Sequence, residues 1–214
     1  MSNRRQRLET AHLYLVCDAQ PDAFLRQALA GGVDIVQLRC KDAGDEEILV
    51  AAARFRSLCR DHDALLVIND RPDLAVAADA DGVHVGQDDE SVSRAREIVG
   101  PDRLVGLSTH TPAQVEAAGE APVDYIGVGP VNATPTKPGR AAVGLELVRH
   151  AVAHSVVPFF AIGGIAPANV TDVARTGARR VAVVRALTRS SDPQSTARAL
   201  RAVLTERRAS VHAA

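Results

Sequence analysis

Short apolar runs alternate with helix-like segments along the whole chain, and this alternation limits the fold more than any other feature. The runs have the length of strands and recur at intervals of about 20 to 30 residues. We expect strands at Leu13–Cys17, Ile35–Leu38, Leu65–Ile68, Gly82–Val85, Leu104–Leu107, Tyr125–Val128, Phe159–Ile162 and Val181–Val184. Continuous apolar strands separated by helices are typical of a parallel sheet with both faces covered.

The segments between these runs carry helix-end signals. Thr111 and Gln114 form a capping box with Pro112 at the first helical position, Asp192-Pro193 repeats the cap and proline, and Asp45 is expected to cap a helix that continues with two glutamates. Glycines stand where four helices should stop: Gly31, Gly100, Gly119 and Gly177. The helices therefore alternate with the strands along the chain.

Eight strand-then-helix units fit either a closed barrel or a doubly wound open sheet. An open sheet usually concentrates its ligand contacts at one switch point, whereas polar residues here follow nearly every predicted strand. We therefore predict an α/β fold, a (β/α)8 TIM barrel that forms a single domain over residues 1–214. Short flexible tails are expected at both ends, including the last ten residues, TERRASVHAA.

Composition excludes several classes of protein. Lys and Arg total 25 against 26 Asp and Glu, and aromatic residues make up 3% of the chain, which disfavours a nucleic-acid partner. The charged N-terminus is not followed by an apolar segment of signal-peptide length, and no run is long enough to span a membrane. We expect a cytoplasmic protein with no membrane partner. Cys17, Cys40 and Cys59 are odd in number and lack C-x-x-C spacing, so we expect plain thiols.

Asp70 and Asp89 follow two neighbouring strands of the predicted barrel. Their carboxylates could therefore converge at one edge. Mg²⁺ prefers hard oxygen ligands and is usually held by one or two carboxylates together with substrate phosphates. The alternative is that such residues cap the next helix, for which Asp88 is a better candidate than Asp89.

Gln37, Arg39 and Lys41 occupy alternate positions on the strand at Ile35–Leu38 and its extension. Alternate residues of a strand share a face, so these three side chains should point the same way. Two cations and an amide can grip the oxygens of an anionic leaving group. The alternative is a cation pair on the surface.

Three further segments carry groups suited to a phosphate. Thr134, Thr136 and Lys137 lie in a Pro- and Gly-rich loop, residues 129–144, that is long for a simple connection. Gly163-Gly164 and Val184-Arg185 follow the last two strands, where barrels commonly bind a phosphate. A tight turn that needs positive φ would explain the glycine pair equally well.

The histidines give weaker signals. His84 lies within a strand, and we expect it to be a hydrogen-bonded interior residue rather than a catalyst. His110, His150 and His154 are expected on the surface or on helices, and we assign them no role.

The ordered set QLRCK, ND, GQDD, LST, TPTK and GGI resembles the thiamine phosphate synthase family over nearly the whole chain. The resemblance implies a (β/α)8 barrel that joins 4-amino-2-methyl-5-hydroxymethylpyrimidine diphosphate to 4-methyl-5-(2-phosphoethyl)thiazole. The enzyme, a transferase of thiamine biosynthesis, would release diphosphate with Mg²⁺ as cofactor. Both partners would be small molecules.

The resemblance also implies roles for individual residues. Asp70 and Asp89 would hold the metal. Arg39, Lys41, Ser108 and Lys137 would act in catalysis. The pyrimidine diphosphate would contact Gln37, Leu38, Arg39, Cys40, Lys41, Asn69, Ser108 and Lys137. The thiazole phosphate would contact Thr134, Pro135, Thr136, Gly164, Val184 and Arg185. Two positions depart from the family pattern: Asn132 stands where Tyr is frequent, and Arg185 where Ser is frequent.

Two rival functions share the predicted pocket. A sister family on the same barrel tautomerises the thiazole phosphate and needs no metal or diphosphate ligands. A non-enzymatic thiamine phosphate sensor would bind without turnover. The set Asp70, Asp89, Arg39 and Lys41 favours the synthase over the isomerase. Whether the chain forms a homo-oligomer is left open.

Overall fold

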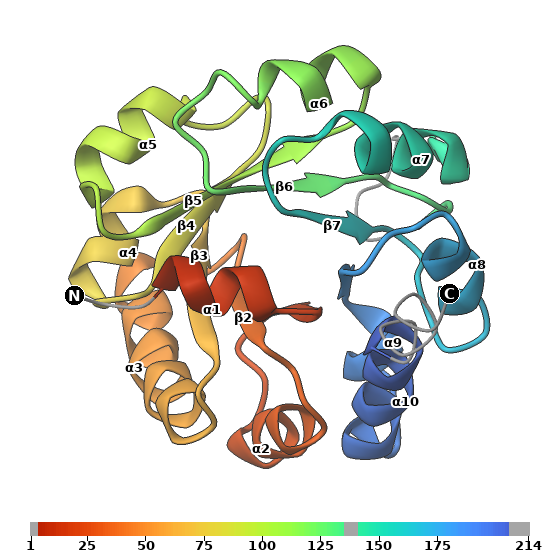
Figure 1. The fold of residues 1–214 in the computed structure, drawn as a ribbon. Helices are drawn as coiled ribbons and strands as arrows, with labels where there is room; N and C mark the ends of the chain where they lie inside the picture. Colours follow the sequence, from red (N-terminus) through yellow and green to blue (C-terminus); the bar gives the residue numbers. More distant parts are fainter. Residues whose placement is uncertain (1–3, 135–140, 206–214) are drawn as a thin grey trace.

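Eight parallel strands close into a barrel in the order of the chain (Figure 1). The computed structural model describes residues 4–134 and 141–205. The strands are β1 (Leu13–Cys17), β2 (Ile35–Leu38), β3 (Leu65–Asn69), β4 (Gly82–Val85), β5 (Leu104–Thr109), β6 (Tyr125–Val128), β7 (Phe159–Ile162) and β8 (Val181–Val183). Pairing of β1 with β8, through Leu13 with Val181 and Leu15 with Val183, closes the ring. The predicted barrel is therefore confirmed, and the open sheet is wrong.

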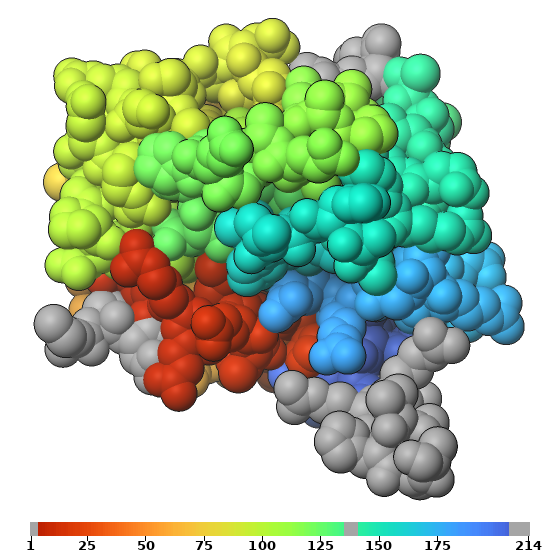
Figure 2. All heavy atoms as spheres, turned by 45° about the horizontal axis from the view of Figure 1, so that its top comes forward, coloured from red at the N-terminus to blue at the C-terminus, as the bar shows by residue number. Residues whose placement is uncertain are grey.

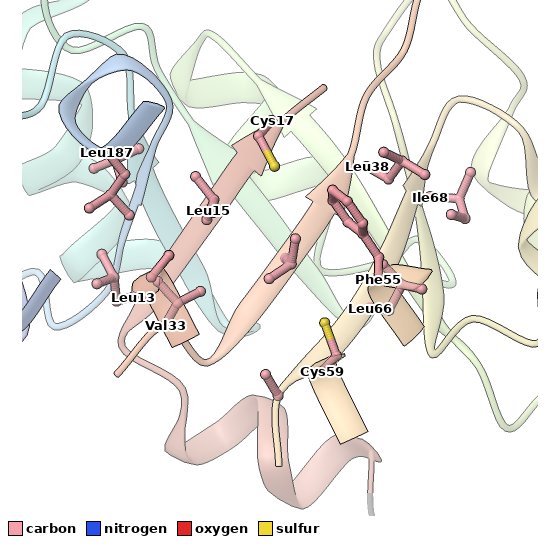
Figure 3. Close-up of a cluster of buried hydrophobic side chains, with 14 of the residues drawn as sticks. Leu13, Leu15, Cys17, Val33, Leu38, Phe55, Cys59, Leu66, Ile68 and Leu187 are labelled. Carbon is pink, nitrogen blue, oxygen red and sulfur yellow. The ribbon is translucent and has the colours of Figure 1, made fainter. Parts of the chain in front are cut away.

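Helices form the outer layer of the barrel. Within the described residues they are α1 (Arg4–Thr10), α2 (Asp22–Ala30), α3 (Asp45–Asp61), α4 (Pro72–Ala77), α5 (Val92–Val99), α6 (Pro112–Ala117), α7 (Gly144–His154), α8 (Val170–Arg175), α9 (Arg185–Thr188) and α10 (Pro193–Thr205). Their apolar faces pack on the outward residues of the strands. Figure 3 shows Phe55 of α3 beside Leu38, Leu66 and Ile68, all in one buried cluster. No helix in the described part of the chain is long and apolar enough to cross a membrane.

Two of the three predicted helix caps are confirmed. The Thr111 hydroxyl accepts a hydrogen bond from the backbone N–H of Gln114 at 3.2 Å, and the Asp192 carboxylate accepts one from Ser195 at 2.9 Å. The prediction for Asp45 is wrong, because Gly44 precedes the helix and Asp45 is its first residue. The Asp45 carboxylate instead accepts two hydrogen bonds from Arg71, at 2.6 and 2.8 Å, and so links α3 to the start of α4.

Helix α1 lies across the amino-terminal end of the barrel (Figure 1), where a flexible tail was predicted. Leu8 is 2% exposed and packs in the interior cluster with Tyr14 and Phe160. Arg4 pairs with Asp81 at 2.9 Å, and Arg5 pairs with Asp124 at 2.8 Å. In the space-filling view this segment, in red, packs against its neighbours (Figure 2). The sequence did not predict this helix, because only one of its side chains, Leu8, is buried and no apolar period results.

Three aspartates repeat one contact at this end of the barrel. Asp34, Asp81 and Asp124 each stand directly before an even-numbered strand. Their carboxylates accept hydrogen bonds from backbone N–H groups of the preceding strand, namely those of Leu13 at 2.9 Å, Leu66 at 2.9 Å and Val105 at 2.8 Å. Each carboxylate also pairs with at least one arginine. The amino-terminal end is thus held together by ion pairs whose aspartates are buried or half-buried.

Candidate active site

A pocket opens at the carboxyl ends of the strands, and residues on or just after all eight strands line it. It collects most of the predicted site residues: Gln37, Arg39, Lys41, Asn69, Asp70, Asp89, Ser108, Thr134, Gly164, Val184 and Arg185. Pro135, Thr136 and Lys137 lie outside the described residues. The polar residues that follow the strands therefore meet in one place, as the barrel required.

Leu38 and Cys40 are the two described site residues whose side chains do not line the pocket. Leu38 is 1% exposed in the cluster between barrel and helices, and Cys40 packs against that cluster. They alternate with Gln37, Arg39 and Lys41, so they face the opposite side of the strand. Only their backbone can contribute to a ligand site.

The three cysteines are free thiols, as predicted. Burial raises the pKa of Cys59 to about 12, and burial also raises the pKa values of the Cys17 and Cys40 thiols. A raised pKa keeps the thiol protonated and unreactive. None of them lines the pocket.

Gln37, Arg39 and Lys41 enter the pocket from β2 and its extension. Gln37 is 3% exposed, and its side-chain amide donates a hydrogen bond to the Tyr14 hydroxyl at 2.7 Å. The backbone N–H of Arg39 donates to Cys17 O at 2.8 Å, which continues the pairing of β2 with β1 past the end of the strand. This pairing holds the backbone that carries the two cations.

Asp70 and Asp89 approach each other across the ends of β3 and β4. The pKa of Asp70 is raised, chiefly because the group is buried and then because Asp89 is a hydrogen-bonding and like-charged neighbour; Asn69 and Lys41 oppose the shift. Asn69 donates to Asp70 Oδ2 at 2.5 Å, and the Gly86 N–H donates to Asp89 Oδ2 at 2.8 Å. Two such carboxylates offer hard-oxygen ligands, and a divalent cation between them would relieve the repulsion of their charges.

The alternative that these aspartates cap helices is wrong. Helix α4 begins at Pro72 after Arg71, and α5 begins after Ser91, whose hydroxyl accepts a hydrogen bond from Arg94 N at 3.2 Å. Asp88, the favoured cap candidate, is therefore not the N-cap of α5. Among the described residues no group of three or more His, Cys, Asp or Glu side chains could hold a metal. The donor set fits Mg²⁺, which is commonly held by two carboxylates and completed by phosphate oxygens and water.

The turn after β7 confirms the tight-turn interpretation of the glycine pair, and both glycines line the pocket. Gly163 has φ 105° and Gly164 has φ 62°, a region in which side chains are strained. A Cβ on Gly163 would lie 2.5 Å from Pro130 Cα. The Gly164 carbonyl accepts hydrogen bonds from Asn132 at 3.3 Å and Asn169 at 2.8 Å. Asn132, at one of the two atypical positions, thus ties the loop after β6 to this turn.

Val184 and Arg185 continue the pocket wall after β8. Arg185 is the first residue of the short helix α9, in which Leu187 and Thr188 donate the first intrahelical bonds, to the carbonyl of Val184. Arg185 is half-buried and lines the same pocket as the glycine turn.

The histidine predictions were partly right. His84 is an interior residue with hydrogen bonds to Tyr125 at 3.2 Å and Ser108 at 3.0 Å, as expected, and it also lines the pocket. His110, predicted to lie on the surface or a helix, directly follows β5 and lines the pocket with its Nδ1 at 2.5 Å from Gly129 O. Its place after LST was the available signal. His150 and His154 lie stacked on α7, as expected.

A family model described as thiamine monophosphate synthase matches residues 13–187. The chain belongs to the thiamine monophosphate synthase family. It is accordingly an enzyme, a transferase, as the resemblance predicted. Within the family it is 51% identical to the thiamine-phosphate synthase of Saccharopolyspora erythraea over 213 residues, which cover 94% of this chain and 96% of the relative.

Two further relatives extend the comparison. The thiamine-phosphate synthase of Synechocystis is 48% identical over 91% of this chain, but the match covers only 58% of that longer protein. The solved structure of thiamine phosphate pyrophosphorylase from Pyrococcus furiosus is 33% identical, covers 94% of this chain and 98% of its own, and superposes with a TM-score of 0.84. Fold and sequence therefore agree on the family.

Proposed function

We propose that this enzyme couples 4-amino-2-methyl-5-hydroxymethylpyrimidine diphosphate with 4-methyl-5-(2-phosphoethyl)thiazole to give thiamine monophosphate and diphosphate. One observation carries the proposal. Two cations, Arg39 and Lys41, and a carboxylate pair, Asp70 and Asp89, line the same pocket as the Gly164 turn. The pocket therefore offers one region for a metal-bound diphosphate and another, formed by loops after β7 and β8, for a phosphate monoester.

In this proposal each group has a specific task. Arg39 and Lys41, together with Lys137, hold the oxygens of the departing diphosphate. Asn69 and Ser108 orient the pyrimidine, and the backbone of Leu38 and Cys40 completes that wall. Asp70 and Asp89 would hold Mg²⁺, which when bound supplies charge stabilisation to the leaving group.

The reaction needs no covalent nucleophile from the protein. The bond between the pyrimidine methylene carbon and the diphosphate oxygen breaks, and its electron pair leaves with the oxygen. The aminopyrimidine ring delocalises the positive charge that develops on the methylene. The thiazole nitrogen then donates its lone pair to that carbon and forms the new C–N bond. The protein contributes positioning and fixed charge.

The thiazole phosphate would bind at the other side of the pocket. Thr134, Pro135, Thr136, Gly164, Val184 and Arg185 are its proposed contacts. Glycine at 164 lets a phosphate approach the backbone closely, and the neighbouring amides can donate to it. We also propose a cytoplasmic location and no nucleic-acid partner, on the composition of the sequence alone. A homo-oligomer stays an open question.

Release of diphosphate distinguishes the synthase from its two rival functions. Purified protein is mixed with both substrates and Mg²⁺, and diphosphate release is followed. The synthase releases diphosphate only when both substrates are present. An isomerase would convert the thiazole phosphate alone, and a sensor would bind thiamine phosphate and release nothing.

Substitution of the carboxylates tests the metal site. Asp70→Ala and Asp89→Ala should each lower kcat by about a hundredfold or more, because the leaving-group charge loses its compensation. The measurement is diphosphate release across a Mg²⁺ titration, with circular dichroism as the folding control. Asp88→Ala is the matched control, since Asp88 is exposed and does not line the pocket. Full activity of both pocket variants at low Mg²⁺ would remove the metal from the proposal.

A further inference from the structure

A chain of hydrogen bonds runs through the barrel interior from Gln37 to Ser108. The Gln37 side-chain amide donates to the Tyr14 hydroxyl at 2.7 Å, and the Tyr14 and Tyr125 hydroxyls lie 2.9 Å apart. The Tyr125 hydroxyl lies 3.2 Å from His84 Nδ1, and His84 Nε2 lies 3.0 Å from Ser108 Oγ. All five residues line the pocket, and the two ends of the chain are proposed pyrimidine contacts. We call these five residues the relay.

The first bond fixes the direction of the others. The Tyr14 hydroxyl accepts from Gln37, and its other hydrogen-bond partner is the Tyr125 hydroxyl, so the single Tyr14 proton is used only when it is donated to Tyr125. Tyr125 in turn donates to His84 Nδ1, which must then be the unprotonated nitrogen. A neutral imidazole carries its proton on one nitrogen only, so His84 Nε2–H donates to Ser108 Oγ. The Ser108 hydroxyl proton is left to point toward the ligand.

We propose that Tyr14, Tyr125 and His84 are positioning residues that fix the hydrogen-bonding polarity of Gln37 and Ser108. Gln37 then presents its carbonyl oxygen as an acceptor, and Ser108 presents its hydroxyl as a donor. A ring that carries an amino group beside an unprotonated ring nitrogen has the complementary pattern, whereas an oxo group beside a ring N–H has the reverse. This inference rests on the proposed function, because it explains how that pocket selects an aminopyrimidine.

The space around the relay is built for these contacts. A Cβ on Gly106 of β5 would lie 2.2 Å from Tyr125 Cζ and 2.5 Å from His84 Nδ1, so only glycine leaves room for the bond between those two rings. Tyr14, Tyr125 and Phe160 make edge-to-face contacts with ring centroids 5.2 to 6.0 Å apart. These contacts restrict the ring positions and thereby hold the hydroxyls in line.

Burial keeps the relay neutral. Tyr14 is 2% exposed and Tyr125 is 0% exposed, and burial raises the pKa of both phenols well above its ordinary value. Both hydroxyls therefore keep their protons and can act as one donor and one acceptor each. A buried hydroxyl without a partner is costly, so breaking the chain at one point frees the groups on either side to reorient.

The tautomer of His84 tests the relay without any substrate. Nitrogen-15 NMR of the imidazole distinguishes Nε2–H from Nδ1–H. We expect the Nε2–H tautomer in the wild-type protein and loss of that single tautomer in Tyr125→Phe, which removes the donor to Nδ1. A wild-type His84 protonated on Nδ1, or a spectrum unchanged by Tyr125→Phe, would overturn the proposal. Because no catalysis is measured, this result stands whether or not the synthase activity is found.

Ligand discrimination tests the consequence. The probes are the pyrimidine diphosphate and its 4-oxo analogue, with affinities measured by calorimetry. The wild-type protein should prefer the amino compound. In Tyr14→Phe and Tyr125→Phe the preference should fall by about three- to tenfold, the worth of one oriented hydrogen bond. Affinity for the thiazole phosphate should be unchanged. An amino preference that survives intact in both variants contradicts the relay.

The matched control removes a buried hydroxyl outside the relay. Thr109 is 0% exposed, donates to Gly127 O at 3.1 Å and does not line the pocket. Thr109→Val should cost stability as the tyrosine variants do and leave the amino preference intact. An equal loss of preference in Thr109→Val would mean that general loosening of the barrel, not the relay, sets the selectivity.

Discussion

At the scale of single residues, one short segment serves both sides of the barrel wall. Gln37, Arg39 and Lys41 line the pocket, while Leu38 and Cys40 pack toward the helices. The polar and apolar demands on the segment alternate because side chains of a strand alternate. A shift of one position would bury the cations and expose the leucine to the ligand. The segment therefore fixes both the register of β2 and the charge of the pocket.

Arg185 lies beside a proposed substrate phosphate, at a position where the resemblance leads us to expect Ser. If its side chain adds charge there, Arg185→Ser should raise the KM for the thiazole phosphate by about tenfold and change the KM for the pyrimidine diphosphate much less. Steady-state kinetics with each substrate varied in turn makes the comparison. Arg189→Ser is the control, because Arg189 is exposed at the other end of α9. Equal effects on the two substrates would mean that the side chain points elsewhere.

Pocket residues were predictable where the pattern within a single strand and its extension was enough to place them. The period-two pattern identified Gln37, Arg39 and Lys41, and position after a strand identified Asp70. Asp89 was chosen over Asp88 only through the family resemblance. The relay was not predictable, because its members come from β1, β2, β4, β5 and β6 and meet only when the ring closes. His110 was missed for a different reason: β5 runs two residues past the predicted Leu107, which carries the pocket wall onward.

At the scale of elements, the strands are held at their amino-terminal ends by the three repeated aspartates. Asp124 is the most buried of them, with its side chain 8% exposed, and it accepts hydrogen bonds from Val105 N, Arg5 and Arg96. Asp81 and Asp34 each have side chains 21% exposed. Loss of a buried carboxylate leaves its partners unsatisfied, so the cost should follow burial.

Asp124→Ala should therefore lower the free energy of unfolding by about 2 kcal/mol, and Asp81→Ala by less. Chemical denaturation measures both. Asp102→Ala, a substitution of an exposed aspartate in the loop before β5, should change stability by less than about 0.5 kcal/mol. Because Asp124 lies at the end opposite the pocket, kcat/KM should be retained. A destabilisation of Asp124→Ala no larger than that of the control would show that this contact does not hold β5.

The elements themselves followed closely from the sequence. Five strands, β1, β2, β4, β6 and β7, begin and end where the apolar runs predicted. Strands β3 and β5 run one and two residues longer, because polar residues such as Asn69 and Ser108 continue the ladder past the apolar run, and β8 ends one residue earlier, at Val183. Helix α1 and the cap at Gly44 were missed, since the first depends on contacts with distant aspartates and the second has no side chain to signal it.

At the scale of the molecule, the two ends of the barrel use their charged residues differently. Its amino-terminal end is closed by α1 and by arginine–aspartate pairs, whereas its carboxyl-terminal end gathers cations, carboxylates and glycine turns around one pocket. Stability and chemistry thus occupy opposite ends, as is usual for this architecture. Within the pocket the groups are again divided: Arg39, Lys41, Asp70 and Asp89 follow β2, β3 and β4, whereas the glycine turn and Arg185 follow β7 and β8.

This division predicts that magnesium and diphosphate bind cooperatively, while the thiazole phosphate binds independently of the metal. Diphosphate alone brings negative charge close to Asp70 and Asp89. With the cation bound, that repulsion becomes attraction, and by linkage each ligand strengthens the other by the same factor. Ligands that bind only the folded state raise Tm according to their affinity, so a thermal-shift series measures the coupling. Diphosphate should stabilise strongly only with Mg²⁺, and the thiazole phosphate equally with Mg²⁺ or a chelator. In Asp70→Ala the rise in Tm caused by diphosphate should depend less on Mg²⁺. If diphosphate raises the Tm of the wild-type protein as much in chelator as with Mg²⁺, a metal-bridged site is excluded, and the isomerase and the sensor become the better explanations.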